Sequence, residues 1–295
     1  MMLAELRAAD NSCVRSAIAN PSGAARLTRS RASHEMRRRV AAGPEEDTRG
    51  AAPSERTFAR RRRRSGLTTA TFEAYGASHL TTLAALACVY GVLRWRLRGG
   101  LREPDATRLS TLLALVVLVH ELGNVALHVF VYGYPWYENL PLNYCRANMW
   151  LTVWMLARRS YAAYEIAYFW AVIGAGLALV TPDLSEPFPH PLFFTFFVGH
   201  GLGLFAVLFA TWGLGFAPRL RSIGVSLAAA CALAAVAWLV NRALGTNYLY
   251  LAHRPEGSPL LDVFEPFPGY RAGVLFFAIA AAFVAWLPFV GQRRN

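Results

Sequence analysis

A short stretch at the start of one apolar segment, LPLNYCRANMWL (Leu140–Leu151), gathers side chains that can do chemistry. It contains the thiol of Cys145, the guanidinium of Arg146 and the amides of Asn143 and Asn148. A thiolate is a competent nucleophile, and a nearby cation or the free N–H groups of a helix N-terminus stabilise it. The two amides can donate hydrogen bonds to the oxyanion of an acyl-transfer intermediate. The stretch therefore predicts a nucleophilic site at the head of a helix.

The same residues have a plainer interpretation that needs no catalysis. In it, Asn143 caps the helix, Arg146 pairs with an acidic residue of another helix, and Cys145 fills space.

A second group of polar side chains lies in HELGNVALH (His120–His128). Glu121, Asn124 and His128 are spaced by three and four residues, which places them on one stripe of a helix. A charged side chain at the centre of a membrane helix costs roughly 2.5–3.5 kcal/mol, so Glu121 needs a partner, and we predict that it is Arg146. The stripe fits either a functional site or a hydrogen-bonding seam between helices. Two histidines on one helix do not by themselves predict a haem or a metal ion.

His200 is the third candidate, and it lies in FFTFFVGHGLGLF between Gly199 and Gly201, with Gly203 beyond. A histidine can deprotonate a thiol and later protonate a leaving oxygen. At a rise of about 1.5 Å per residue, Cys145 and His200 fall in the same half of a membrane, which allows the two to pair. The glycines have two interpretations, which are close helix packing through a GxxxG pair and room for a bulky substrate beside His200.

The connection NYLYLAHRPEGSPLLDVFEPFPGY, residues 247–270, is long for a link between two helices. Connections of this length are usually functional or disordered, and the aromatic content favours function. We predict that it binds substrate through Asn247, Tyr248, Arg254 and Asp262. The alternative is an aromatic belt at the membrane interface.

The elements that would carry these residues are membrane helices. Hydrophobic residues make up 55% of the chain and charged residues 16%, against about 45–50% and 25% in soluble domains. The apolar residues are gathered into seven runs of a length that suits membrane helices. These are His79–Leu93, Leu109–Val131, Leu140–Leu156, Tyr164–Val180, Pro191–Leu214, Ile223–Leu244 and Ala272–Val290. The sequence predicts an all-α polytopic membrane protein, with a bundle of about seven transmembrane helices over residues 72–295.

Residues 1–71 differ from the rest, because they are rich in Arg, Ala, Ser and Gly and have no helical apolar period. Such a segment cannot bury enough apolar surface to offset the entropy of ordering, so we predict a disordered basic tail. No folded nucleic-acid-binding module accompanies its arginine runs, so we predict no nucleic-acid partner. We expect the functional protein to begin near Gly66–Phe72.

The arginines outside the tail predict the orientation in the membrane. Most of them lie in the first, third and fifth connections and near the C-terminus, whereas the second (VYGYPWYEN) and the fourth (TPDLSEPFPHP) have none. The positive-inside rule then places the second, fourth and sixth connections outside and the C-terminus in the cytoplasm.

The four cysteines, Cys13, Cys88, Cys145 and Cys231, form no CxxC pair and have no metal-ligand spacing. We therefore predict neither a metal site nor another cofactor. Cys88 and Cys231 lie among Ala, Leu and Val, where a free thiol is usually a small buried hydrophobe.

The sequence resembles the YwaF-type integral membrane family. The matching segments are, in order, LPLNYC, YEIAYFW followed by TPDL, FFTFFVGHGL, and NYLYLAHRPEGSPLLD followed by PFPGY. They cover the chain from about Phe72 onward, and the last is the most specific. The chain departs from YwaF-type proteins at Asn143 and Glu265, where those proteins usually have His and Gly. That family is similar in turn to the animal transmembrane protein 164 group of cysteine-dependent phospholipid acyltransferases.

The resemblance implies a phospholipid acyltransferase or lipid hydrolase in the bacterial cytoplasmic membrane, with membrane lipids as substrates. Cys145 stands in the place of the nucleophile, His200 in that of its partner, and Glu121 in that of an acidic residue of the preceding helix. No protein partner and no oligomeric state follow from it. Two other classes stay open, a transporter or small-molecule binding protein with a cavity lined by Glu121, His128 and His200, and a structural membrane protein.

Overall fold

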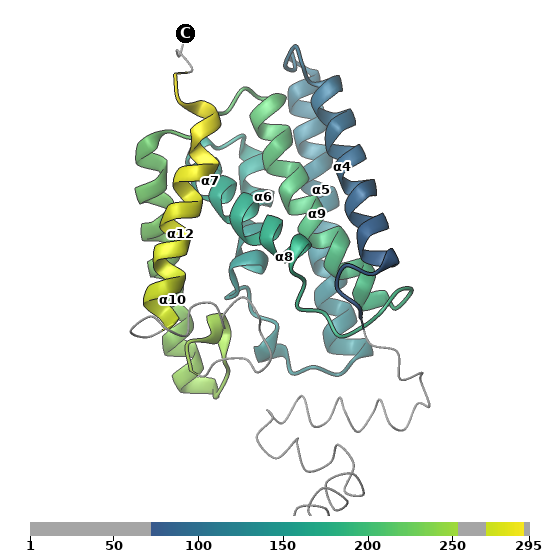
Figure 1. The fold of residues 1–295 in the computed structure, drawn as a ribbon, viewed down its shortest axis with the longest axis vertical. Coiled ribbons are helices and arrows are strands. Elements are labelled where there is room, and N and C mark those ends of the chain that lie inside the picture. Colours follow the sequence, from purple (N-terminus) through teal and green to yellow (C-terminus); the bar gives the residue numbers. More distant parts are fainter. Residues whose placement is uncertain (1–71, 253–269, 292–295) are drawn as a thin grey trace, which may run out of the picture. The chain divides into compact units, whose positions relative to one another are not determined.

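The computed structural model describes residues 72–252 and 270–291, and over these residues the chain is a helical bundle without strands (Figure 1). The helices belong to one compact unit, Thr69–Asn295. The predicted tail 1–71, the predicted start near Gly66, and the predicted substrate-binding residues Arg254 and Asp262 lie outside the described residues.

Each predicted apolar segment is helical. The helices are, in chain order, α4 (Ala77–Arg96), α5 (Asp105–Ala126) with the π-helical η2 (Leu127–Val131), the 3-10 helix η3 (Trp136–Glu138), α6 (Tyr144–Arg158), α7 (Tyr161–Phe169) continued by the π-helical η4 (Trp170–Ala175) into α8 (Gly176–Val180), α9 (Pro191–Trp212), α10 (Leu220–Leu244), the 3-10 helix η5 (Tyr248–Tyr250), α12 (Tyr270–Trp286) and the 3-10 helix η6 (Leu287–Phe289).

Five helices of the described chain are long and apolar enough to cross a membrane, and a further apolar helix, Gly273–Phe289, is shorter. The five span Ala77–Arg96, Asp105–Val131, Tyr161–Val180, Pro191–Trp212 and Leu220–Leu244. The protein is therefore an all-α membrane protein. The predicted span at Leu140–Leu156 needs correction, because α6 begins only at Tyr144 and has 15 residues. At about 1.5 Å per residue such a helix is shorter than the roughly 30 Å hydrocarbon core.

The helix ends follow from local sequence. Pro191 is the first residue of α9, and the preceding His190 caps the helix by accepting a hydrogen bond on Nδ1 from the Leu192 N–H at 3.2 Å. The α10 helix is ended by Gly245, the C-cap residue that follows it. The φ of 67° at Gly245 lies in the left-handed region that glycine adopts without strain. Ser160 caps α7 by accepting a hydrogen bond from the Ala163 N–H.

The outer surface of the bundle is apolar, as a lipid-facing surface requires. The large exposed side chains include Val89 and Val92 on α4, Leu112 and Leu115 on α5, Leu239 on α10, and Phe276 and Val284 on α12. Cys88 and Cys231 are also exposed, which corrects the prediction that they are buried. Both thiols lie on faces that the surrounding helices do not cover. The sequence did not predict this, because an apolar helix face has the same residue types whether it contacts protein or lipid.

Helix α9 packs against three other helices through three glycines. A Cβ atom added to Gly199 would lie 2.8 Å from Cε1 of His120 on α5, and one added to Gly201 would lie 2.8 Å from Cδ2 of Leu86 on α4. At Gly203 it would lie 3.2 Å from Sδ of Met149 on α6. Neighbouring helices therefore fill the space beside these glycines. The close-packing interpretation is right, and the idea that they leave room for a substrate is wrong.

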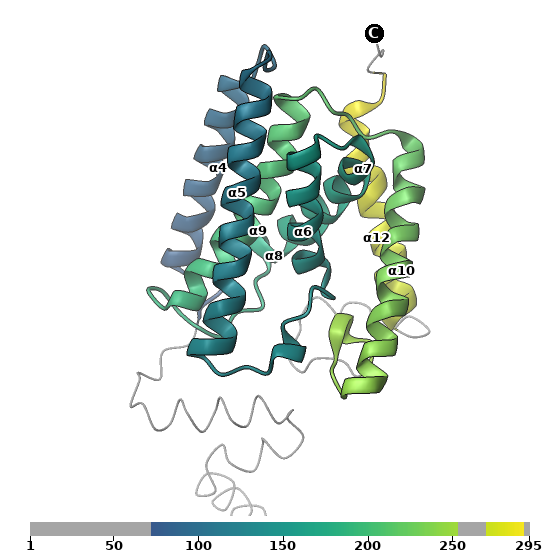
Figure 2. The same cartoon turned by 180° about the vertical axis from the view of Figure 1, so that it is seen from behind.

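The connections divide between the two ends of the bundle (Figures 1 and 2). At one end, the α4–α5 and α9–α10 connections are joined by a hydrogen bond from the Leu101 N–H to the Gly213 carbonyl of 2.8 Å. Tyr161, which follows the α6–α7 connection, donates from its hydroxyl to the Ala217 carbonyl at 2.8 Å. This is the arginine-rich end, where the Arg219 guanidinium also lies 4.9 Å from the Tyr161 ring centroid.

Candidate functional site

The predicted nucleophile is the second residue of α6, so it lies in the first turn, where backbone N–H groups have no partner within the helix. Asn143 occupies the N-cap position with an extended backbone, but its side chain does not cap the helix. Its Oδ1 accepts a hydrogen bond from the Leu249 N–H at 3.2 Å instead. The amide that was predicted to cap α6 or to bind an oxyanion thus ties the head of α6 to η5, a segment more than 100 residues away in the chain.

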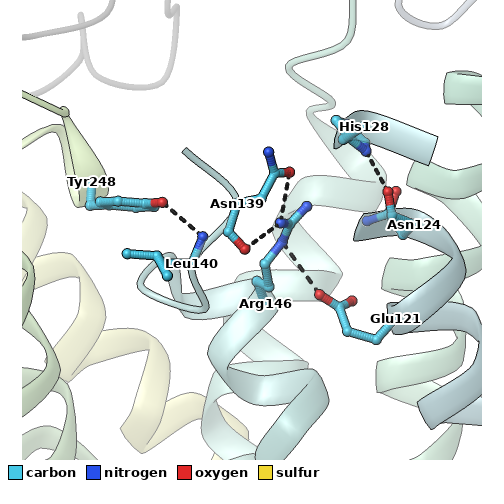
Figure 3. Close-up of polar contacts among 7 residues, drawn as sticks. All are labelled: Glu121, Asn124, His128, Asn139, Leu140, Arg146 and Tyr248. Atoms are coloured by element: carbon cyan, nitrogen blue, oxygen red, sulfur yellow. Dashed lines mark hydrogen bonds and ion pairs between the residues drawn. The ribbon is translucent and has the colours of Figure 1, made fainter. Parts of the chain in front are cut away.

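The Arg146 side chain turns away from the thiol and toward α5. Its Nε lies 3.4 Å from Oε1 of Glu121, which confirms the predicted ion pair (Figure 3). Its Nη1 donates to the main-chain oxygen of Asn139 at 2.9 Å and to Oδ1 of that residue at 3.1 Å. Glu121 balances the charge of Arg146, so the uncompensated positive potential beside the Cys145 thiol is that of the first turn of α6. No sequence pattern indicated that Asn139 completes this cluster.

Glu121 is only 2% exposed, and within the described chain its Oε1 makes the ion pair without a hydrogen bond of good geometry. Further along the stripe, His128 lies in η2 and donates from Nδ1 to the Asn124 carbonyl at 2.8 Å (Figure 3). The predicted stripe is thus real, but His128 is bound to its own helical turn. It is not bound to Glu121.

His200 is held in one tautomer. Its Nδ1 lies 2.8 Å from the Phe196 carbonyl, which can only accept, so the ring proton is on Nδ1. The ring also packs on Phe196, with centroids 4.3 Å apart. The lone pair of Nε2 is left without a hydrogen-bond partner among the described residues. A neutral imidazole with a free Nε2 has the form that a general base needs.

The rotation of α9 directs His200 toward the gap between α6 and α8. Phe193 and Phe197 pack in one cluster with Leu179 of α8. At 3.6 residues per turn, these two side chains point about 80–120° away from Gly203, which faces α6. The direction of His200 lies between that of Gly203 and those of the two phenylalanines, about 60° from Gly203. Its ring therefore points toward the region where η4, which leads into α8, lies beside α6.

Cys145 enters the same region from α6. Its Sγ lies 4.0 Å from the position that a Cβ of Gly174 in η4 would take. Met149 contacts Gly203, and Cys145 and His200 lie four and three residues before this contact on helices that start at the same end of the bundle. At about 1.5 Å per residue their depths differ by only about 1.5 Å. Among the described residues no hydrogen bond joins the thiol and the imidazole, so the two groups lie at a similar depth without being bonded to each other.

Asn148, the other predicted oxyanion donor, is 2% exposed and lies at the contact of α6 with α9. Its Nδ2 is 3.9 Å from the Cβ position of Gly203, and its Oδ1 has no hydrogen-bond partner in the described chain. Thr152, one turn further along α6, is fully buried with an equally unpartnered Oγ1.

Tyr248 and Asn247 were predicted to bind substrate. Their polar atoms instead form hydrogen bonds within and between the connections at this end of the bundle. The Tyr248 hydroxyl accepts from the Leu140 N–H at 2.9 Å and donates to the Tyr137 carbonyl at 2.7 Å (Figure 3). The main chain of Tyr248 is held by both side-chain atoms of Asn241, at 2.8 and 3.0 Å. Burial raises the pKa of the Tyr248 phenol. Asn247 accepts from the Ala252 N–H at 3.0 Å.

The α8–α9 connection also joins this cluster, since the Tyr250 hydroxyl donates to Oδ2 of Asp183 at 3.3 Å. Nearby, the ring of Tyr132 lies 5.8 Å from that of His190, and burial together with the charge of Glu186 raises the pKa of Tyr132. The connections between α5 and α6, α8 and α9, and after α10 therefore cover the end of the bundle at which α6 begins. In the described part of the chain, no group of three His, Cys, Asp or Glu side chains is placed to hold a metal ion.

Comparison with known proteins shows which family the chain belongs to. The model of the TMEM164 family matches residues 74–286, which include Cys145, His200 and the whole polar cluster. This chain belongs to the TMEM164 family. An uncharacterized protein of Treponema pallidum (strain Nichols) is 26% identical over 222 residues, which are 75% of this chain and 91% of the relative. No solved structure matches the chain.

Proposed function

We propose that this TMEM164 family member is a phospholipid acyltransferase or lipid hydrolase with Cys145 as nucleophile and His200 as base. The observation that carries the proposal is the convergence of the two side chains at one depth, between α6, η4 and α9. The free Nε2 of His200 supports it. The resemblance of these positions to cysteine-dependent acyltransferases points the same way, whether or not the chain also groups with YwaF-type proteins.

In the first half-reaction, Nε2 of His200 takes the proton of the Cys145 thiol, and Sγ attacks the carbonyl carbon of a lipid ester. The C–S bond forms, and the tetrahedral oxyanion is stabilised by free N–H groups in the first turn of α6. The C–O bond then breaks, and the imidazolium returns its proton to the leaving lysolipid oxygen. A small rotation of either side chain is needed, because the thiol and the imidazole are not bonded at rest.

The Glu121–Arg146 pair has a positioning role in this proposal. Arg146 neighbours the nucleophile in sequence, and its bonds to Glu121 and Asn139 fix the head of α6 against α5 and the α5–α6 connection. We also propose that the end with this cluster faces outward, because the arginines are concentrated at the opposite end.

The test is intact-protein mass spectrometry of the purified protein after incubation with phospholipid vesicles. We expect a hydroxylamine-labile acyl adduct on Cys145 that is lost in Cys145→Ala and strongly reduced in His200→Ala. Cys88→Ala and Cys231→Ala are the matched controls, because both thiols are exposed on the apolar surface. Lipid turnover that survives Cys145→Ala would show that another residue is the nucleophile.

A proton-coupled transporter is the second candidate. It is favoured by buried polar atoms of α5 and α6 that have no hydrogen-bond partner in the described chain, on Ser110, Asn148 and Thr152. Such atoms inside a membrane bundle are typical of hydrated paths. Uptake of solute into liposomes driven by a pH gradient, absent in Glu121→Gln, would support this function, and an acyl adduct on Cys145 would oppose it.

A further inference from the structure

His120 is a half-buried imidazole that the proposed acyl transfer does not use. It sits on α5 beside Glu121, and its ring packs against Gly199 of α9, where a methyl group would lie 2.8 Å from Cε1. Both ring nitrogens are buried without a hydrogen-bond partner in the described chain. The main-chain carbonyl of Thr195 faces the ring, but not with the geometry of a hydrogen bond. At least one ring nitrogen is thus left for a ligand.

A second unpartnered group lies one turn away on the same face of α9. Gly199 and Gly203 are four residues apart, so their missing side chains point the same way, about 6 Å apart along the helix. His120 fills the first position, and at the second the amide of Asn148 lies beside Met149, with its Nδ2 3.9 Å from the Cβ position. Oδ1 of Asn148 is buried and has no partner. Two neighbouring orphan groups from different helices, at the junction of α5, α6 and α9, indicate a shared ligand.

The chemistry of the two groups selects the ligand, because a hydroxyl group both donates and accepts. It satisfies an imidazole nitrogen and an amide in either orientation of the Asn148 side chain. A phosphate or carboxylate oxygen can only accept, so it would leave Oδ1 unpaired.

We propose that His120 and Asn148 form a binding site for one hydroxyl group, and that this hydroxyl is the acyl acceptor of the second half-reaction. The proposal rests on the proposed function, and it extends that function to the acceptor. The hydroxyl oxygen attacks the thioester carbonyl on Cys145, the C–O bond forms and the C–S bond breaks. The hydroxyl proton passes to an imidazole nitrogen and from there to the departing thiolate. The hydroxyl belongs either to water or to a lipid alcohol.

The first experiment follows the decay of the Cys145 acyl adduct in the full-length protein. Wild type, His120→Leu and Asn148→Leu are acylated from phosphatidylethanolamine vesicles, then exposed to ¹⁸O-labelled water with or without added lysophosphatidylethanolamine. Labelled fatty acid reports water as acceptor, and new diacyl lipid reports a lipid alcohol. We expect both variants to form the adduct and to release it at least about tenfold more slowly, as expected when groups that bind and deprotonate a nucleophile are removed. An unchanged decay rate overturns the proposal. The control Thr82→Val, on α4 with its hydroxyl bonded to the Ser78 carbonyl, leaves the decay rate unchanged.

A second experiment does not depend on catalysis. If a hydroxyl group, supplied by water in the resting protein, joins the two side chains, then His120→Leu and Asn148→Leu each lower the thermal midpoint, and the double variant lowers it by less than the sum. If the junction is dry, each substitution removes an unpaired polar group, and the midpoints rise additively. Additive rises overturn the site. A wild type that forms no adduct defeats the proposed function instead, and the thermal cycle then decides alone whether the hydroxyl site exists.

Discussion

The ion pair between Glu121 and Arg146 allows a quantitative test of how the head of α6 is held. Their side chains are 3% and 17% exposed, and the atoms Oε1 and Nε lie 3.4 Å apart. Removing one partner of a buried pair typically costs about 3–5 kcal/mol, because the other charge is left uncompensated. We expect Glu121→Ala to fall at the lower end, about 3 kcal/mol. The guanidinium cannot lose its charge, but it keeps two hydrogen bonds to Asn139.

The double variant Glu121→Ala with Arg146→Met removes both charges and keeps most of the apolar volume. We expect it to cost about 1 kcal/mol, chiefly for the Asn139 oxygens that lose a donor. The coupling between the two sites is then about 2 kcal/mol or more. For a domain of this size, about 1 kcal/mol shifts the midpoint by roughly 2–4 °C. Glu121→Ala should therefore melt about 6–12 °C below wild type, and the double variant only about 2–4 °C below it.

The assay is thermal unfolding in a mild detergent, followed by tryptophan fluorescence for wild type, both single variants and the double variant. The ion pair between Glu103 and Arg159 is the matched control, because its side chains are 56% and 44% exposed and water screens them. Its own cycle should be additive. Additive effects at Glu121 and Arg146 as well would refute the conclusion that this pair is coupled.

Two further predictions concern the end of the bundle at which α6 begins. The raised pKa of Tyr248 means that its contribution to stability is complete below the ordinary tyrosine pKa of about 10 and is lost as the pH rises from there toward the folded-state value. Tyr248→Phe should remove this loss of stability above about pH 10, at a cost of about 1–3 kcal/mol at neutral pH from the unpaired Leu140 N–H and Tyr137 carbonyl. A midpoint that keeps its full pH dependence in the variant would oppose this role. The second prediction concerns the orientation and uses variants without the native thiols. Ser185→Cys in the α8–α9 connection should react with an impermeant maleimide in intact cells, whereas Gly99→Cys in the α4–α5 connection should react only after permeabilisation. The reverse pattern would show that the topology is inverted.

The sequence was sufficient wherever the decisive interaction was with the membrane. Apolar runs near the length of the hydrocarbon core predict helices, because every backbone N–H and C=O must be paired inside lipid. The cost of burying a charge predicted that Glu121 needs a cation, and Arg146 is that cation. The three- and four-residue spacing of Glu121, Asn124 and His128 defined one face of α5, since that depends only on the helical repeat.

Tertiary structure decided what each polar side chain bonds to, since this depends on how helices are rotated and which chain ends meet. Asn143 bonds to Leu249, and Tyr248 to Leu140, across more than 100 residues that no local pattern connects. Glu165, for which no sequence pattern indicated a partner, accepts a hydrogen bond of 2.6 Å from the Ser222 hydroxyl.

The GxxxG pair shows the same division at the candidate site. Its spacing defines a face of α9 without side chains, but nothing in the sequence states what fills that face. The packing of α5 and α6 against α9 places His120 at Gly199 and Asn148 at Gly203. It also turns His200 toward the region between α6 and η4, into which Cys145 projects. The chemical groups of the site were visible in the chain, and the rotation of three packed helices determined which of them lie together.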